Sequence, residues 1–310
     1  MDLESRIDRD LAEGFRRLTP FRLPDDLASL REAPVRPTSS AVAVKITERY
    51  ISGADGHEMF IKIYEPAKRD GTRLPALLWI HGGGYVLGHP NGEDMICEGF
   101  AIASGCVVVS PDYRLAPEHP YPAAIEDCYA ALQWVAGAEE ALTIDTARIA
   151  IGGASAGGGL TAALALLARD RGGPAICFQM PLYPMIDDRN ATPSSHEIED
   201  RRIWNGANNA AAWRMYLGDG QTGAVSPYAA PSRAEDLTGL PPAYTCVGQL
   251  DPFRDETIDY VARLARAGVD VEFHLYPGGY HAFEHIVPDA EISRRAKNDY
   301  MNALARAFHK

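Results

Sequence analysis

The sequence predicts an α/β fold, with a mostly parallel central sheet flanked by helices. Short β-branched apolar segments alternate along the chain with amphipathic helical stretches, which is the pattern of a parallel sheet covered by helices. The chain has 310 residues, of which 46% are apolar, enough for the core of one large domain with or without a smaller lid. The expected strands are residues 57–64, 75–80, 106–110, 148–152, 175–182, 243–248 and 271–276. The expected helices are residues 123–136, 158–169, 256–267 and 290–308.

Two segments interrupt this alternation. The N-terminal segment is helical and ends in a proline-marked linker at residues 33–37, and the second segment separates two core strands. Long insertions of this kind often act as lids, and open α/β sheets bind ligands at the carboxyl ends of their strands. We therefore expect both segments to form one cap there. The expected division is cap segments at residues 1–45 and 185–231, with the catalytic domain at residues 46–184 and 232–310.

The charge of the chain excludes several partners. A formal net charge of −12 repels phosphate backbones and anionic lipid headgroups, so neither nucleic acid nor a membrane is expected. The longest apolar stretches, such as residues 75–80, are far shorter than the roughly 20 residues of a membrane-spanning helix. The N-terminus lacks the pattern of a signal peptide, and the five cysteines form no CxxC pair. We expect buried reduced thiols and a cytoplasmic protein.

The strongest local pattern is G-x-S-x-G around Ser155, between an apolar strand and a helix. A sharp strand-to-helix turn brings neighbouring backbone close, so it needs the glycines at positions 153 and 157. The same turn aims the Ser155 hydroxyl out of the sheet, at the positive end of the following helix. A phosphate loop would need a lysine that is absent here, and a dinucleotide loop would need its glycines earlier in the turn. Ser155 is therefore the predicted nucleophile.

A glycine-rich segment, His81-Gly82-Gly83-Gly84, follows the strand expected at residues 75–80. Acyl transfer needs backbone N–H groups aimed at the oxygen that becomes negative in the tetrahedral intermediate, and glycines leave such groups uncovered. The amides of Gly82 and Gly83, together with that of Ala156 after the nucleophile, are the expected donors. Together they predict an oxyanion hole beside Ser155.

A serine hydroxyl needs a base, and the base needs an acid. Asp251 follows one expected strand and His281 follows the last one, so both lie at the carboxyl ends of strands, in the chain order that such a site requires. Asp255 and Glu256 are alternative acids, but they stand where the next helix begins and are interpreted as first-turn charges. The histidines that lack such a placement are expected on the surface or in packing roles: His57, His89, His119, His196, His274, His285 and His309.

From about residue 60 onward, the chain resembles the hormone-sensitive lipase family of bacterial esterases within the α/β-hydrolases. Five motifs carry the resemblance, in the family's order: HGGGYVLG at residues 81–88, DYRLAPEHPYPAAIED at 112–127, SAGG at 155–158, DPFRDE at 251–256 and the histidine loop. The resemblance implies an α/β-hydrolase fold with a helical cap and hydrolysis of short- to medium-chain acyl esters without a cofactor. It also implies that the DYRLAPEHPYPA segment, residues 112–123, is structural, with charges that pair locally.

Two residues depart from the family pattern: Ala154 stands where Asp or Thr is usual, and Gly159 where Asn commonly follows SAGG. They leave the subfamily open. A zinc peptidase is a rival interpretation, because residues 281–285 match H-x-x-E-H, but that motif needs a helix and the Pro277-Gly278-Gly279 run before it predicts a loop. No metal is therefore expected.

A receptor that binds a small molecule without catalysis is a second rival interpretation, because the same fold also serves that function. Related receptors have lost the catalytic histidine, whereas His281 is present here in its motif. The acyl preference is open, because Trp204, Trp213 and Tyr216 in the expected cap insertion could form an acyl wall or pack the cap against the body. The expected partner is a small ester, and a homodimer is a further possibility.

Overall fold

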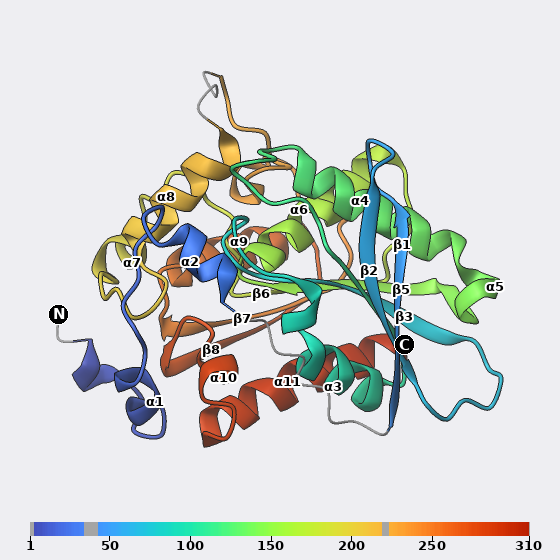
Figure 1. The fold of residues 1–310 in the computed structure, drawn as a ribbon, viewed down its shortest axis with the longest axis horizontal. Coiled ribbons are helices and arrows are strands. Elements are labelled where there is room, and N and C mark those ends of the chain that lie inside the picture. The colour runs from blue at the N-terminus through green and yellow to red at the C-terminus, as the bar shows by residue number, and fades with distance from the viewer. Residues whose placement is uncertain (1–2, 34–42, 219–222, 310) are drawn as a thin grey trace.

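The computed structural model describes residues 3–33, 43–218 and 223–309. Within these ranges, eight strands form one sheet in the order β1-β2-β4-β3-β5-β6-β7-β8 (Figure 1). β1 pairs with β2, and β2 with β4, in antiparallel fashion, whereas all later pairs are parallel. The strands are β1 (Val44–Ser52), β2 (Glu58–Pro66), β3 (Leu74–Ile80), β4 (Val107–Pro111), β5 (Ile144–Ala154), β6 (Phe178–Leu182), β7 (Ala243–Leu250) and β8 (Val271–Tyr280).

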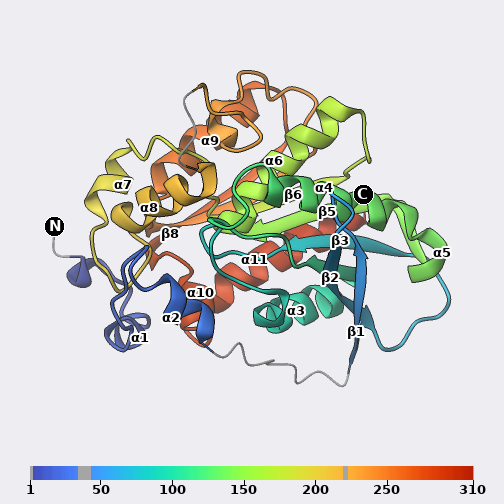
Figure 2. The same cartoon turned by 45° about the horizontal axis from the view of Figure 1, so that its top comes forward.

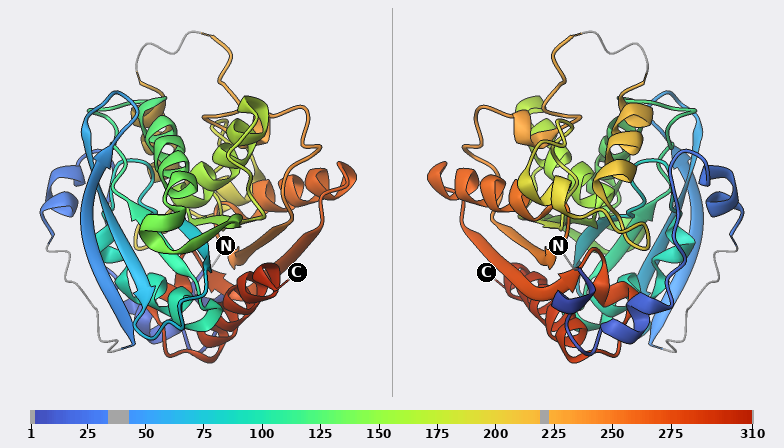
Figure 3. Two further views of the ribbon diagram at one scale, coloured as in Figure 1. Left: turned by 90° about the vertical axis from the view of Figure 1, so that its right-hand side faces the viewer. Right: turned by 90° about the vertical axis from the view of Figure 1, so that its left-hand side faces the viewer.

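Helices cover both faces of the sheet (Figure 3). α4 (Ala123–Gly137), α6 (Ala156–Arg171) and α9 (Arg254–Arg266) pack on one face, and α3 (Asp94–Ser104) and α11 (Glu291–Phe308) on the other. Because successive side chains of a strand point to opposite faces, each face has its own apolar core. The remaining elements are η1 (Glu4–Arg6), α1 (Ala12–Arg16), α2 (Leu27–Glu32), η2 (Pro90–Gly92), α5 (Glu139–Leu142), α7 (Pro193–Glu197), α8 (Gly206–Leu217), η3 (Pro231–Arg233) and α10 (Phe283–Ile286).

The predicted α/β fold is confirmed, and every expected strand and helix corresponds to one in the structure. One detail was wrong: residues 277–280, expected as a loop, are the last residues of β8, and His281 follows the strand directly. Their pairing with β7 is irregular near Gly248, and Gly278 has a positive φ of 74°, so this strand end tolerates the Pro-Gly-Gly run.

The sequence did not reveal β1 or α3. β1 is an edge strand whose side chains are mostly exposed or half-buried, so it lacks a clean apolar alternation. α3 buries the acidic residues Asp94 and Glu98 among its apolar ones, which hides its periodicity. Its end is regular, since Gly105 adopts the left-handed conformation that commonly terminates a helix.

The two segments expected to form a cap contact each other. The backbone N–H of Phe21 donates to the carbonyl of Arg201, and that of Leu23 donates to Asn208 Oδ1. Figures 1 and 2 show α2 near α8 at the end of the sheet where α7 also lies. β1 begins at Val44, so the sheet starts just before the boundary expected at residue 46. Residues 34–37 of the expected linker lie outside the described residues.

None of the helices in the described part of the chain combines the length and apolarity that crossing a bilayer requires. All five cysteines are free, and four of them are buried: Cys97, Cys106, Cys128 and Cys246.

The first turn of α6 is packed so closely that side chains are excluded. A Cβ atom on Gly159 would lie 2.1 Å from the carbonyl oxygen of Met185 and 2.2 Å from the Tyr85 hydroxyl oxygen. That hydroxyl donates to the same Met185 carbonyl at 2.6 Å. The space that an Asn at this position would need is therefore filled here by the tyrosine, which gives the departure at Gly159 a physical explanation.

Gly159→Ala should accordingly lower the free energy of unfolding by about 1–3 kcal/mol, the usual cost of overpacking a tight core. Gly137→Ala is the matched control, because Gly137 also lies in a helix but has no neighbour within 4 Å of the added Cβ. That control should be neutral or slightly stabilising. Urea unfolding measures both, and equal stability of the Gly159 variant and the unmodified chain would contradict the packing argument.

Candidate active site

Ser155 stands at a strained turn between β5 and α6. Its backbone has φ 58° and ψ −119°, a conformation that costs a non-glycine residue roughly 1–3 kcal/mol and persists only where the surroundings impose it. The surroundings are backbone: a Cβ on Gly153 would lie 2.5 Å from the carbonyl oxygen of Gly157, and one on Gly157 would lie 2.0 Å from that of Ile80. Both glycines that the motif predicted are thus sterically required.

The side chains of Ser155, His281 and Asp251 form one hydrogen-bonded line. His281 Nε2 lies 3.0 Å from Ser155 Oγ, and His281 Nδ1 lies 2.8 Å from Asp251 Oδ2. The three residues come from the ends of β5, β8 and β7, which are parallel and therefore end at one edge of the sheet. The structure thus brings together the three residues that the sequence singled out.

This line fixes the imidazole tautomer. An ionised Asp251 only accepts hydrogen bonds, so His281 Nδ1 carries the proton and Nε2 is free to accept the proton of the Ser155 hydroxyl. Asp251 is fully buried and its other oxygen accepts the backbone N–H of Phe253 at 2.8 Å. Ser155 and His281 are each 7% exposed, so both lie nearer to solvent than Asp251 does.

The segment after β3 supplies bare amides beside Ser155. A Cβ on Gly82 would lie 3.5 Å from the Ser155 Cβ, which measures how closely the two segments approach. The carbonyl of Gly83 accepts the N–H groups of Val86 and Leu87, and this turn leaves the Gly82 and Gly83 amides without an acceptor among the described residues. Ala156 is the first residue of α6, where the helix leaves its amides unpaired. The geometry therefore suits the predicted oxyanion hole.

Comparison with known proteins decides the family. A family model described as "alpha/beta hydrolase fold" matches residues 77–285, which include Ser155, Asp251 and His281. The chain belongs to this family. Its hormone-sensitive lipase-like branch is the one that the sequence motifs indicated.

The similar proteins are esterases. The chain is 41% identical to esterase LipI of Mycobacterium tuberculosis over 300 residues, which cover 94% of this chain and 92% of that protein. It matches the structure of a bacterial heroin esterase with a TM-score of 0.92 at 40% identity, covering 98% of both chains. Esterase LipW from Mycobacterium marinum gives a TM-score of 0.92 at 35% identity, covering 100% of this chain and 98% of that one. This α/β-hydrolase is a carboxylic ester hydrolase.

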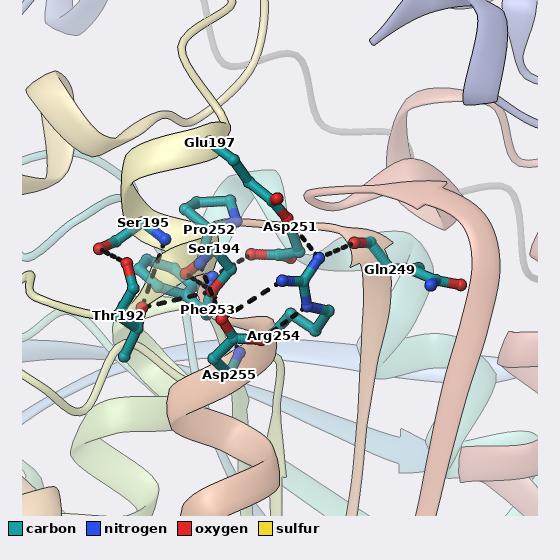
Figure 4. Close-up of polar contacts among 10 residues, drawn as sticks. All are labelled: Thr192, Ser194, Ser195, Glu197, Gln249, Asp251, Pro252, Phe253, Arg254 and Asp255. Carbon is teal, nitrogen blue, oxygen red and sulfur yellow. Dashed lines mark hydrogen bonds and ion pairs between the residues drawn. The ribbon is translucent and has the colours of Figure 1, made fainter. Parts of the chain in front are cut away.

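The Asp251 loop of this α/β-hydrolase is tied to α7. Arg254 lies between Glu197 Oε1 at 2.5 Å and the carbonyl of Gln249 at 3.0 Å (Figure 4). Ser194 Oγ donates to the carbonyl of Pro252 at 2.8 Å, and the Ser194 N–H donates to Asp255 at 2.7 Å. This clamp cannot be predicted from the sequence pattern, because its partners on α7 lie about 60 residues from the loop.

The two rejected acids have other partners. Asp255 and Glu256 stand in the first turn of α9, as expected, but each also holds the chain that follows β6. Glu256 is buried and its Oε1 accepts the N–H groups of Ile186 and Asp187 at 2.8 and 3.3 Å. Burial raises the pKa of Glu256 well above its usual range. Among the described contacts neither carboxylate meets His281, whereas Asp251 does, so of the three carboxylates Asp251 is the one in the hydrogen-bonded line.

Three aromatic rings surround the imidazole. The rings of Tyr183 and Phe253 meet His281 nearly perpendicularly, at centroid distances of 5.2 and 5.1 Å, and Trp204 lies at 6.4 Å. The Trp204 ring also fills the space that a side chain at position 84 would need. Trp213 and Tyr216, by contrast, pack on Tyr85 and are almost fully buried. Of the three aromatic residues that the sequence offered as an acyl wall, only Trp204 lies beside the catalytic line.

The segment at residues 112–127 supports the glycine-rich segment from behind. The Tyr113 ring stacks on His81 at 4.2 Å, and its hydroxyl donates to the His81 carbonyl at 2.9 Å. Arg114 binds Asp127 through two hydrogen bonds of 2.8 and 3.0 Å, which is the expected local pairing. Arg114 also binds Asp55, and Glu118 pairs with Arg31 of α2, so the expectation of local pairing holds for Arg114 only in part and was wrong for Glu118.

The groups of the H-x-x-E-H match are separated by their partners. His281 faces Ser155 and Asp251, and Glu284 accepts the hydroxyl proton of Tyr183 at 2.5 Å. His285 lies in α10, whose first residue is Phe283, so no single helix carries both histidines. In the described part of the chain, no cluster of three or more His, Cys, Asp or Glu side chains is arranged to hold a metal ion.

Asp251→Asn should lower kcat roughly 10³- to 10⁴-fold with little change in KM, because an amide favours the wrong imidazole tautomer and stabilises no cation. Asp255→Asn is the matched control, since it removes a nearby carboxylate, in the first turn of α9, whose described partners do not include His281. Steady-state kinetics on p-nitrophenyl butyrate compare the two. A greater loss in the Asp255 variant would exchange the two roles.

We expect His81 to make the stability of the fold depend on pH. Burial lowers the pKa of His81 to about 4. Below pH 6.5 the unfolded chain therefore binds a proton at His81, whereas the native state does not bind it until the pH approaches 4. Stability should therefore fall as the pH drops from 6.5 to 4, by on the order of 3 kcal/mol in all. His81→Asn preserves a donor toward the Gly82 carbonyl that Nδ1 now binds at 2.8 Å.

The measurement is urea unfolding of both proteins at pH 7 and pH 4.5. The Asn variant should lose about 2 kcal/mol less than the unmodified chain between these two pH values. An identical acid-induced loss in both proteins would show that other groups cause it.

Proposed function

We propose that this α/β-hydrolase cleaves short- to medium-chain acyl esters through an acyl-enzyme on Ser155. The observation that supports the proposal is the line of 3.0 and 2.8 Å contacts that joins Ser155 to His281 and His281 to Asp251. A serine hydroxyl is unreactive alone and becomes a nucleophile when a neutral imidazole can take its proton. The bare amides beside it suit the negative charge that then develops.

The first half-reaction forms the acyl-enzyme. Ser155 Oγ attacks the ester carbon while His281 Nε2 takes the hydroxyl proton. The Asp251 carboxylate stabilises the resulting imidazolium, and the amides of Gly82, Gly83 and Ala156 bind the oxyanion. Nε2 then passes the proton to the leaving alcohol, and the C–O bond of the ester breaks.

The second half-reaction restores the serine. Water takes the place of the alcohol, His281 removes its proton, and the hydroxide attacks the acyl carbon. Collapse of the second tetrahedral intermediate releases the carboxylic acid, and the proton on Nε2 returns to Ser155 Oγ. No step needs a metal or an organic cofactor, because the serine and the imidazole supply the nucleophile and the proton transfer.

The substrate is a small ester. Trp204 lies against Gly84 and near His281, so a bulky aromatic side chain bounds the space over the reacting groups. The low exposure of Ser155 and His281 indicates a narrow approach, which favours acyl chains shorter than those of long-chain triglycerides. The net charge of −12 favours neutral substrates over anionic polymers such as nucleic acids.

We further propose a cytoplasmic location, supported by five cysteines that form no disulfide. A homodimer is a weaker expectation. β8 stands at the end of the sheet order and is therefore an edge strand with one unpaired side, a surface on which a second copy could pair. Size-exclusion chromatography with light scattering measures the oligomeric state.

Ser155→Ala should abolish hydrolysis of p-nitrophenyl butyrate, with a fall in kcat of about 10⁴-fold or more, because the nucleophile is lost. The wild-type rate should peak within the acetate-to-octanoate range of p-nitrophenyl esters and collapse at palmitate. A serine-directed phosphonate should add to Ser155, visible as a mass increase absent from the variant. Wild-type turnover by the Ala variant would refute the assignment.

A further inference from the structure

The residues after β6 are bonded to the backbone of Ser155. The Ser155 N–H donates to the carbonyl of Leu182 at 2.9 Å, and the Ser155 carbonyl accepts the N–H of Met185 at 3.0 Å. Tyr183 lies between these two residues and donates its own N–H to the Cys246 carbonyl. Residues 182–185 therefore hold the nucleophile's main chain from both sides, and the position of Tyr183 is fixed relative to Ser155.

The side chain of Tyr183 reaches the other partner of the reaction. Its ring meets the His281 imidazole at 5.2 Å and 79°, an edge-to-face contact. Its hydroxyl donates to Glu284 Oε1 at 2.5 Å, and Glu284 lies three residues after His281 in the first turn of α10. The Tyr183 side chain is thus held by the same short segment whose histidine it supports.

This contact is built at a cost in stability. Tyr183 has φ 32°, in the left-handed region that favours glycine, and Ala282 between His281 and α10 has φ 57°. Glu284 is 3% exposed, and its Oε2 has no hydrogen-bond partner among the described residues. A strained backbone and a buried carboxylate with one unpaired oxygen both lower the free energy of unfolding. Strained backbone of this kind concentrates at functional sites.

The hydrogen bond to Asp251 does not fix the orientation of the imidazole ring completely. It fixes Nδ1, but the ring can still swing about that point, and Nε2 at its far side would move with it. The perpendicular rings of Tyr183 and Phe253 restrict that swing. Of these two rings in the described part of the chain, that of Tyr183 belongs to a residue whose chain neighbours, Leu182 and Met185, are hydrogen-bonded to the main chain of Ser155.

We propose that Tyr183 and Glu284 are positioning residues that set the approach of His281 Nε2 to Ser155 Oγ. The inference rests on the proposed function, because it concerns the proton transfer between these two atoms. It gives the Glu of the H-x-x-E-H match a role that is not metal binding: its carboxylate anchors Tyr183. Tyr183 and Glu284 are 4% and 3% exposed and Tyr183 contacts the imidazole, so we expect the pair to act through His281.

The test removes the Tyr183–Glu284 hydrogen bond without leaving a buried group unpaired. The double variant Tyr183→Phe/Glu284→Leu removes donor and acceptor together, which is far milder for the fold than removing one of them. Its kcat on p-nitrophenyl butyrate should fall about 5- to 50-fold with KM unchanged within about twofold, because a small misplacement of a proton acceptor slows chemistry and not binding. Phosphonate labelling of Ser155 should slow by a similar factor.

Glu284→Gln is the rescue variant. The Gln carbonyl still accepts the Tyr183 hydroxyl proton, so kcat should remain within about threefold of the wild-type value if the hydrogen bond is what matters. A loss as large as that of the double variant would show that the negative charge, and not the position of the ring, supports the reaction. The positioning role would then be wrong.

A second buried tyrosine and carboxylate pair provides the matched control. Tyr64 donates to Asp94 Oδ1 at 2.7 Å, both residues are fully buried, and they lie on β2 and α3, which carry none of the reacting groups. Tyr64→Phe and Tyr183→Phe should both lower Tm. Only the Tyr183 variant should lower kcat when both are assayed well below their Tm.

Failure of the proposed function and failure of the positioning inference give different experimental results. If the unmodified chain hydrolyses no ester, or if Ser155→Ala does so equally well, the proposed function is wrong. If ester hydrolysis depends on Ser155 but the double variant keeps wild-type kcat, or changes KM alone, the positioning inference is wrong and the function stands. Equal losses of kcat in the Tyr64 and Tyr183 variants would reduce the effect to general destabilisation and likewise overturn it.

Discussion

The close contact between two backbone segments, at the end of β3 and at the turn after β5, is the constraint on which the site depends. The space that a Cβ on Gly157 would fill is already occupied by the carbonyls of Ile80 and His81. No side chain can come between the nucleophile's turn and the glycine-rich segment, so the serine and the bare amides stay within reach of one carbonyl group. The strained φ of Ser155 is tolerated because this packing leaves the chain no other path.

The parallel sheet brings the remaining groups of the site to the same edge. β3, β5, β7 and β8 end at one edge, and each contributes one chemical group just beyond its last residue. Short strand-end loops carry little freedom, so Asp251, His281 and Ser155 need few additional contacts to align. Burial then strengthens each contact, because Asp251 is removed from water and its charge acts on His281 in a medium of low dielectric constant.

Much of this was predictable from the sequence because the chemistry needs particular residue types at strand ends. Ser155 and Asp251 follow apolar segments closely, His281 comes a few residues after the last expected strand, and the glycines around Ser155 and at positions 82 and 83 mark backbone that must approach closely. Their meeting in space follows from the parallel sheet. Their catalytic roles stay predictions until the variants are measured.

What the sequence could not give are contacts between distant segments. Tyr183 follows β6 and Glu284 follows β8, and nothing in the local pattern of either shows that they meet. The clamp between Arg254 and Glu197 is hidden in the same way, and so is the reason for Gly159, which depends on the Tyr85 hydroxyl. β1 escaped notice because an edge strand buries too little to produce a regular alternation.

The clamp on the Asp251 loop has a consequence for how the expected cap and the chemistry are related. Glu197 and Ser194 belong to the segment at residues 185–231, and they hold the residues directly after Asp251. The start of the same segment binds Ser155 through Met185 and Glu256 through Ile186. A displacement of this segment as one body would therefore move Ser155 and the residues after Asp251 together. The geometry of the Ser155–His281–Asp251 line thus depends on the position of this segment, because the same hydrogen bonds hold both.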